Sequence, residues 1–388
     1  MVRLDPQAQW RLSKRGLLLA GRHGDVVLLE HPRAARLPAL LSDDPDPAEL
    51  ERRLGPPGQA GLVEELIAQG VFTDVVCPDD VAGQAPAVKP PRCRLTRSGL
   101  MISGVEHPAR WIETHVMPFF AHPAGRLLTL ILVAAGGVAL LYGRPDVPTV
   151  SSTPALEVVL MVVIGTAATA LHELAHAVAM VHYGRTPRLA GFGFYWGAVS
   201  FFVDSTPALT LPRRARVIQA LAGLAVDVVT TAGFAIAAHL VSDTLWAIVF
   251  WRLAVLACVD ILINLAPVLQ VDGHWALADW LDEPDLALRA RRALGAALGG
   301  SLPRRHRWLA CYGAFSLLAG IGLLAAMSLV FWASAGDLVV SLFAGNPAEI
   351  ALGAYYVAPI VLGVVFSGIG LLVEIMRVGQ PDGRGAAA

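Results

Sequence analysis

A histidine, a glutamate and a second histidine stand together in an apolar stretch of the chain. Residues 172–176 read His-Glu-Leu-Ala-His. Residues four apart on a helix lie on the same face, so His172 and His176 can hold one zinc ion between them. Glu173 beside them can take a proton from a water molecule on that ion. The motif therefore predicts a zinc-dependent hydrolase with Glu173 as its general base.

A third ligand must come from elsewhere, because hydrolytic zinc sites have three protein ligands and one open position. Residues 264–274 read Asn-Leu-Ala-Pro-Val-Leu-Gln-Val-Asp-Gly-His. Pro267 must end or bend a helix there, and Gly273 leaves the backbone free to turn. This break favours Asp272 as the third ligand, pointing inward. Asp260, one turn before Asn264 on the same helical face, is the weaker alternative because it lacks this break.

The elements that must position these residues are long and apolar. Of the 388 residues, 55% are hydrophobic and 16% charged, which is less charge than soluble domains usually carry. Most of the apolar runs approach the ~20 residues that a bilayer crossing needs. A His-Glu-His group at membrane depth is costly and indicates function. The predicted spans are Arg126–Tyr142, Leu156–Met180, Val217–Leu240, Leu245–Leu265, Trp308–Ala333 and Ala351–Met376.

Positive charge alternates between the loops. Arginines gather between spans two and three, between spans four and five, and after span six, whereas the other loops hold few. Cytoplasmic loops carry the excess of Lys and Arg. We therefore expect a multi-pass bacterial cell-membrane protein with both termini cytoplasmic and the zinc motif in the cytoplasmic half of span two. The net charge of −1 gives no indication of nucleic-acid binding.

The first 75 residues are more polar and read as a separate unit. Gly16–Ala20 and Val26–Glu30 predict a β-hairpin, and helices are expected over 32–41, from Asp46, and over 60–69. This pattern is typical of a winged-helix domain. The predicted fold is thus mainly α: a small α+β winged-helix-like cytosolic domain before a polytopic domain of about six transmembrane helices.

Three further segments complete the organisation. Residues 76–121 read as a linker and an interfacial segment, residues 122–378 as the membrane domain, and residues 379–388 as a disordered tail. The aromatic and glycine residues of 191–202 predict a short membrane-associated β-hairpin. That hairpin could offer an exposed edge to an extended substrate, or it could only anchor the chain at the interface.

The two motifs together resemble those of the site-2 protease family of intramembrane zinc metalloproteases. The resemblance covers roughly residues 122–285 and rests on 172–176 and on Asn-x-x-Pro-x-x-x-x-Asp-Gly at 264–273. It implies a protease in which a sheet pairs with the substrate. By residue-to-residue match it implies that the zinc ligands are His172, His176 and Asp272. It also implies that Glu173 is the general base and that Asn264 lies near the substrate backbone.

Several polar residues keep two interpretations. The family often has Gly-Pro-x-x-Asn where this chain has Gly223-Leu-Ala-Val-Asp227, so Asp227 either assists the site from behind or pairs with Arg252. His274 is expected to support the site indirectly, with a role as fourth ligand the alternative. Glu157, near the outer end of span two, is expected to reach water.

The substrate depends on what residues 1–75 bind. Their hairpin and helices resemble the RiPP recognition element, a winged-helix domain that binds leader peptides; a generic docking domain is the alternative. The leading hypothesis is a zinc protease that removes the leader from a ribosomally made, modified peptide of, for example, the daptide type. A regulatory protease for a membrane-anchored transcription or anti-sigma factor is the second, and a non-enzymatic protein for peptide immunity or export is the third.

Overall fold

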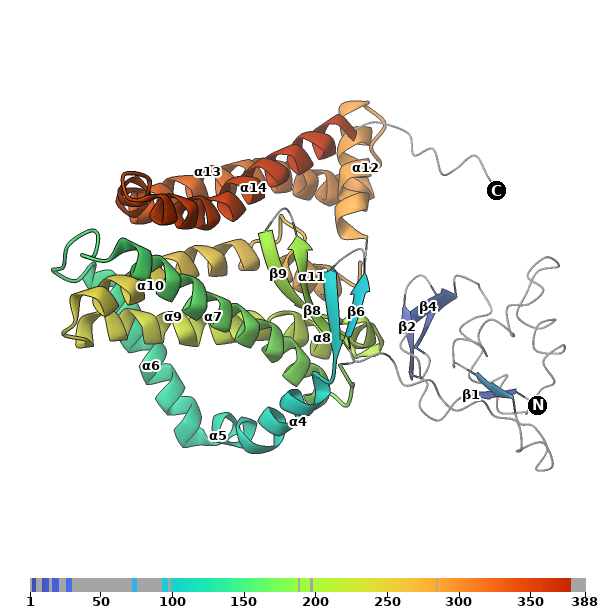
Figure 1. Ribbon diagram of the computed structural model, residues 1–388. Helices are drawn as coiled ribbons and strands as arrows, with labels where there is room; N and C mark the ends of the chain where they lie inside the picture. Colours follow the sequence, from blue (N-terminus) through green and yellow to red (C-terminus); the bar gives the residue numbers. More distant parts are fainter. Residues whose placement is uncertain are drawn as a thin grey trace.

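The structure, a computed structural model, describes ten stretches of the chain. They are residues 2–4, 9–13, 16–20, 26–29, 72–74, 93–96, 99–187, 189–195, 198–283 and 285–377. Long helices form the main body, and short strands from the N-terminal region lie beside one end of it (Figure 1). The chain is mainly helical, as its apolar periodicity predicted.

Six helical segments are long and apolar enough to cross a membrane, which confirms the predicted number. The third of them has a break at Leu221, so it consists of the short helix α8 followed by α9. The segments are α6 (Pro123–Tyr142), α7 (Pro154–His182), α8 (Arg213–Ala220) with α9 (Ala222–Leu240), α10 (Thr244–Leu265), α13 (Arg307–Phe343) and α14 (Pro347–Arg377).

All six segments extend beyond their predicted bounds, and the structure shows the reason for two of them. Helix α6 begins at Pro123 because the ring of His122 accepts a hydrogen bond from the backbone N–H of Ala124, which caps the first turn. Helix α13 runs past the predicted end at Ala333 to Phe343. Its added turns contribute Leu338 and Leu342, which are fully buried, to the core. Tertiary packing therefore extends the helix across the charged Asp337.

The centre of the membrane domain is a cluster contributed by three helices. Buried apolar residues of α7, α10 and α13 pack together, and residues of α14 cover them. Small residues let α6 approach α9 closely, since a Cβ added at Gly136 would lie 2.4 Å from Cα of Ala232. Close contact between small residues is how membrane helices commonly associate. The packed helices hold α7, which carries the zinc motif, in place.

Glu157 does not reach water, contrary to expectation. It is fully buried and forms an ion pair with Arg252 of α10. The backbone N–H of Ser151 donates a second hydrogen bond to Glu157, at 3.0 Å, and Arg252 donates to the carbonyl of Ser334 at 2.9 Å. The partner lies on a distant helix at the same depth, which the sequence alone cannot reveal. Arg252 is therefore not the partner of Asp227.

Loss of Arg252 should strongly destabilise the protein, because Glu157 would remain as a buried, unpaired charge. For Arg252→Leu we expect a loss of about 3–5 kcal/mol, measured as a lower thermal unfolding temperature in detergent. The double variant Glu157→Leu/Arg252→Leu removes both charges and should recover much of that loss. Equal unfolding temperatures for Arg252→Leu and the unchanged protein would show that the pair does not hold the helices together.

The predicted β-hairpin is part of a larger sheet. Strands β8 (Leu189–Tyr195) and β9 (Ala198–Val203) pair antiparallel. Two more strands, β6 (Cys93–Thr96) and β7 (Gly99–Ser103), extend the sheet in the order β6-β7-β8-β9. Two of its four strands thus come from residues 76–121, which were predicted to be a linker and an interfacial segment. Four-residue and five-residue strands without clear alternation were too short to recognise in the sequence.

Two short helices connect this sheet to the first membrane helix. They are α4 (Glu106–His115) and α5 (Met117–Ala121), in the segment predicted to be interfacial. Trp111, Phe119 and Phe120 are exposed, as expected for side chains that lie at a membrane surface. The buried side of α4 packs against the last turns of α7.

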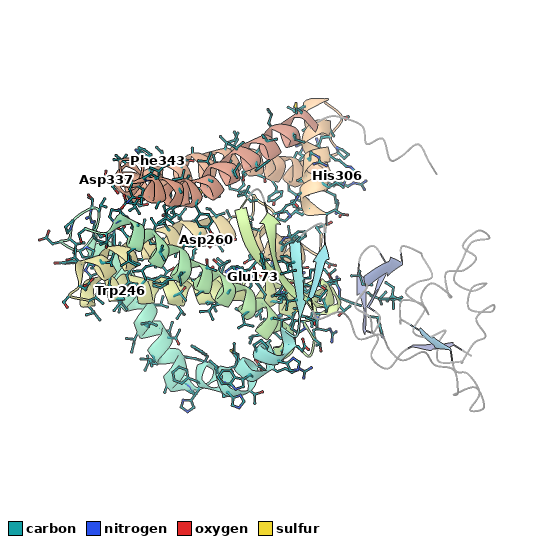
Figure 2. The ribbon with its side chains drawn as sticks, in the orientation of Figure 1. Glu173, Trp246, Asp260, His306, Asp337 and Phe343 are labelled. Atoms are coloured by element: carbon teal, nitrogen blue, oxygen red, sulfur yellow. The ribbon has the colours of Figure 1, made fainter. Side chains whose placement is uncertain are left out.

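The loops predicted to be cytoplasmic lie at one end of the helical body. Figure 2 shows His306 near this end, Trp246 and Asp337 toward the opposite end, and Glu173 and Asp260 between them. The remaining short helices of this region are η4 (Thr206–Thr210), α11 (Asp272–Leu281), α12 (Leu286–Leu298) and η5 (Arg304–His306). The arginine-rich loops therefore share one side of the domain, as their charge pattern predicted.

The N-terminal region contributes two small sheets. Strand β1 (Val2–Leu4) pairs with β5 (Phe72–Asp74), and β2 (Gln9–Ser13) pairs with the predicted hairpin of β3 (Gly16–Ala20) and β4 (Val26–Leu29). The hairpin is thus confirmed. The three expected helices, and with them the winged-helix assignment, lie outside the described residues, as does the tail at 379–388.

Candidate metal centre

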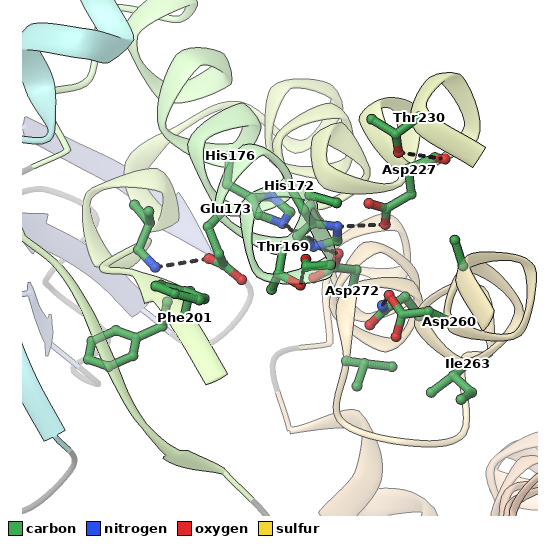
Figure 3. A pocket seen from close by; sticks show the side chains of 18 of the residues that line it. Thr169, His172, Glu173, His176, Phe201, Asp227, Thr230, Asp260, Ile263 and Asp272 are labelled. Atoms are coloured by element: carbon green, nitrogen blue, oxygen red, sulfur yellow. Dashed lines mark hydrogen bonds and ion pairs between the residues drawn. The ribbon is translucent and has the colours of Figure 1, made fainter. Parts of the chain in front are cut away.

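Three side chains from two helices, one of them a candidate membrane span, converge on one point. The Nε2 atoms of His172 and His176 on α7 lie 3.2 Å apart. The Oδ2 atom of Asp272, the first residue of α11, lies 3.1 Å from the former and 3.3 Å from the latter. Figure 3 shows the three side chains facing one another. Of the described His, Cys, Asp and Glu side chains, only these three form a group that could hold a metal ion.

The other ring nitrogens of the two histidines have their own partners. His172 Nδ1 lies 2.6 Å from Asp227 Oδ2, and His176 Nδ1 lies 2.7 Å from the backbone carbonyl of Gln219. Both partners are acceptors, so each Nδ1 carries the proton and each Nε2 presents a lone pair. Such partners fix the tautomer and the ring orientation of histidine ligands. Of the two interpretations of Asp227, the structure agrees with the one in which it assists the site from behind.

The chemistry of Asp272 fits a cation as its partner. Its Oδ2 is buried and makes no hydrogen bond of acceptable geometry within the described structure. Two imidazole lone pairs and one carboxylate oxygen facing a common point are a donor set suited to a metal ion.

The break after α10 places Asp272 as the sequence predicted. Helix α10 ends at Leu265, two residues before Pro267, and α11 begins at Asp272. Gly273 has another role than the one expected. It lies in helical conformation within α11, and a Cβ there would fall 2.2 Å from the carbonyl oxygen of Leu265. Gly273 thus allows α11 to start directly against the end of α10.

A second close contact involves Gly223 on α9. A Cβ added at Gly223 would lie 2.4 Å from Nε2 of His172, the atom that faces the proposed ion position. Only a residue without a side chain can occupy this position while His172 keeps its orientation. Asp227, one turn further along α9, holds the opposite side of the same ring. Helix α9 therefore determines the orientation of His172 from two sides.

Glu173 lies beside the ligands and faces the sheet. Its Oε2 accepts a hydrogen bond of 3.0 Å from the backbone N–H of Val203, the last residue of β9. Figure 3 shows the carboxylate between the histidines and Phe201 of the same strand. The contact joins a group able to transfer protons to the strand at the sheet edge.

A cavity of about 1120 Å³ opens onto these side chains. Asp260 and Asn264 of α10 line it and bond to each other, with Asn264 Nδ2 donating to Asp260 Oδ2 at 3.1 Å. Neither belongs to the converging group, so Asp272 and not Asp260 is the third member. Apolar residues of α13 and α14, among them Phe331 and Ile360, also line the cavity. The cavity thus combines a polar site with an apolar wall.

His274 is directed away from the converging group. Its Nδ1 lies 3.1 Å from the hydroxyl of Tyr312 on α13, and that hydroxyl donates to the carbonyl of Pro267. Burial lowers the pKa of His274, so the ring is neutral. It fastens the loop before Asp272 to α13. It is not a fourth ligand.

Removal of the Asp227 carboxylate should weaken metal binding. In Asp227→Ala the ring of His172 loses the partner that fixes its tautomer, and we expect roughly 10–100-fold lower affinity. Titration against a chelator of known zinc affinity measures this. Asp227→Asn retains an acceptor, and its zinc affinity should lie between those of Asp227→Ala and the unchanged protein. Asp146→Ala, in an exposed loop at the other end of the domain, should have the affinity of the unchanged protein. Unaltered affinity in Asp227→Ala would exclude this role.

Sequence reasoning missed three contributors to the site. The Gln219 carbonyl and the Val203 N–H are backbone groups, which carry no signature in a sequence. Gly223 stood out only as part of the opening of span three. Each acts through a contact between segments that are distant in the chain.

Comparisons with known proteins give no match for this chain: no family model, no curated protein and no solved structure matches it.

Proposed function

We propose that this protein is a membrane-embedded zinc metalloprotease of the site-2 protease type. The observation that carries the proposal is the convergence of His172 Nε2, His176 Nε2 and Asp272 Oδ2, with Glu173 next to them in the same cavity. Two histidines and one carboxylate with an open side are the ligand set of a hydrolytic zinc site. The six membrane helices around it favour a substrate that reaches the site within or at the bilayer.

The residues of the chain divide the reaction between them. Zinc, when bound by the three ligands, supplies Lewis acidity to a water molecule and to the scissile carbonyl. Glu173 takes the proton of the attacking water and delivers it to the leaving amine. Asp227 and the Gln219 carbonyl hold the two imidazoles in their ligand tautomer. The apolar wall of the cavity limits the access of bulk water.

The substrate would bind in extended form along β9. This strand lies at an edge of the four-stranded sheet and, among the described strands, pairs only with β8. Its last residue, Val203, contacts Glu173. Edge strands offer unpaired backbone groups to an added peptide strand. A peptide paired with β9 would therefore be led to the general base.

We further propose that the substrate is a ribosomally made precursor peptide and that the reaction removes its leader. The three-stranded sheet of β2, β3 and β4 (the N-terminal sheet) offers a place to hold such a leader. Its strand β2 is an edge strand and exposes Trp10 and Leu12. In the register with β3 these two residues pair with Leu19 and Leu17, which are buried. An apolar face thus continues to β2, which among the described strands pairs only with β3, and a peptide strand could be added at its other side.

The orientation in the membrane follows from charge. The arginine-rich loops lie at the same end of the body as the N-terminal strands (Figure 1), and the positive-inside rule places that end in the cytoplasm. The metal ligands lie in the part of α7 nearer this end, since α7 ends at His182. A peptide made in the cytoplasm would therefore meet the N-terminal sheet first and the metal centre next.

The test is cleavage by the purified full-length protein in detergent. Candidate precursor peptides and membrane-anchored regulatory proteins are incubated with the zinc-loaded protein, and products are identified by mass spectrometry. We expect one defined cut in a precursor, lost with a chelator and restored by zinc. A cut only in the anchored regulators would support a regulatory protease instead. Zinc binding without cleavage of any substrate would support a non-enzymatic role.

A further inference from the structure

A buried arginine lines the same cavity as the metal ligands. Arg216 of α8 is only 2% exposed. Its Nε donates to Asp279 Oδ1 at 2.5 Å, its Nη2 to Asp282 Oδ1 at 3.3 Å, and its Nη1 to the carbonyl of Leu211 at 3.1 Å. All three sides of the guanidinium are therefore occupied. The two carboxylates belong to α11 and to the residue that ends it.

The two helices joined by Arg216 each position one part of the metal centre. Helix α8 carries Gln219, about one turn after Arg216, and the Gln219 carbonyl accepts from His176. Helix α11 begins with Asp272, about two turns before Asp279. A shift of α8 along α11 would move the partner of His176 relative to Asp272. The geometry of the ligand set therefore depends on the contact that Arg216 makes.

Gln219 also connects α8 to the segment that follows β9. Its side-chain amide donates to Ser205 Oγ at 3.1 Å, two residues after the Val203 that contacts Glu173. Movement of α8 would thus reach the surroundings of the general base as well as those of the metal ligands.

We infer that Arg216 is a positioning residue for the metal centre, and that the carboxylate of Asp282 extends its action to the N-terminal sheet. Arg11 of β2 donates to the same Oδ1 atom of Asp282, at 3.3 Å, and β2, β3 and β4 all lie against η4. The inference deepens the proposed function but needs only the metal site and not peptide hydrolysis.

The arrangement can couple the position of the N-terminal sheet to the spacing of α8 and α11. Two guanidinium groups and two carboxylates form a network in which the formal charges cancel, and Asp282 is the member common to both arginines. The planar guanidinium fixes direction as well as distance, which a lysine cannot do. Because charge-paired groups at low exposure tolerate little displacement, docking of the N-terminal sheet and the spacing of α8 and α11 are coupled.

The test uses the full chain and reads the metal centre directly. Metal affinity is measured by competition with a chelator, and ligand geometry by the visible absorption of the cobalt-loaded protein. For Arg216→Met we expect roughly 10–100-fold weaker affinity, the range found when groups behind a metal ligand are lost, and a changed cobalt spectrum. Arg214→Met removes an exposed arginine of the same helix and should alter neither. Arg216→Lys serves if Arg216→Met does not fold, and should also change the spectrum.

The link to the N-terminal sheet has its own outcome. Arg11→Met should shift affinity and spectrum in the same direction as Arg216→Met but less, and should add nothing in the double variant. A lower unfolding temperature of Arg216→Met with wild-type affinity and spectrum would overturn the positioning role. An effect of Arg216→Met without one of Arg11→Met would overturn the extension to the sheet. A protein that binds metal but cleaves no peptide would refute the proposed function and leave this inference standing.

Discussion

Replacement of Glu173 by glutamine should reduce peptide hydrolysis by about 10²–10⁴-fold, the contribution of a general acid–base group, while the protein keeps its metal ion. Glutamine retains the size of the side chain and can still accept from the Val203 N–H, but it cannot take the proton of the attacking water. The change is measured as the rate of product formation by mass spectrometry, alongside metal content.

Glu106→Gln provides the matched control for this variant. Glu106 is the first residue of α4, outside the metal centre. Its replacement by glutamine should leave the rate of hydrolysis unchanged. A Glu173→Gln protein that turns over at the wild-type rate would remove Glu173 from the mechanism. A variant that has lost its metal would instead assign Glu173 a role in metal binding.

Gly223→Ala should abolish the metal centre through a single methyl group. The new Cβ would lie 2.4 Å from His172 Nε2, which is much closer than a non-bonded carbon and nitrogen can approach. Neither helix can move away without displacing Asp227 or disturbing the packing of α9. We therefore expect a loss of affinity at least as large as the roughly 10–100-fold seen when supporting groups are removed, and with it loss of hydrolysis.

The same helix supplies the control. A Cβ at Gly233 meets nothing within 4 Å, so Gly233→Ala should keep full metal content and slightly favour the helix, since alanine has the higher helical propensity. Metal analysis and thermal unfolding of the two variants decide the matter. Normal metal binding by Gly223→Ala would mean that close contact with Gly223 does not hold His172 in place.

The membrane helices were predictable because their signal is local. Hydrocarbon length and apolar composition identify a span without reference to the rest of the chain, and proline and glycine mark where α10 ends and α11 begins. The strands β6 and β7 escaped because each is short and its pairing is not visible in the sequence: β6 pairs with β7, and β7 pairs with the distant β8. The end of α13 was misplaced for a similar reason, since Leu338 and Leu342 gain their burial from α7 and α10.

The ligand residues could be found by spacing, and their supports could not. His172 and His176 share a helical face by periodicity alone, whereas Asp272 needed the second motif. The contact of Asp227 with His172, the pairing of Glu157 with Arg252 and the network of Arg216 each join helices far apart in sequence. Charged residues at membrane depth indicate a partner, but a single sequence does not name it.

Elemental analysis of the purified protein tests the central claim most directly. We expect one zinc ion per chain in the wild type, full retention in Asp260→Ala, and loss in Asp272→Ala, because Asp272 is the carboxylate that joins His172 and His176 among the described residues. A wild-type protein without a stoichiometric ion, or an ion that survives Asp272→Ala but is lost in Asp260→Ala, would contradict it.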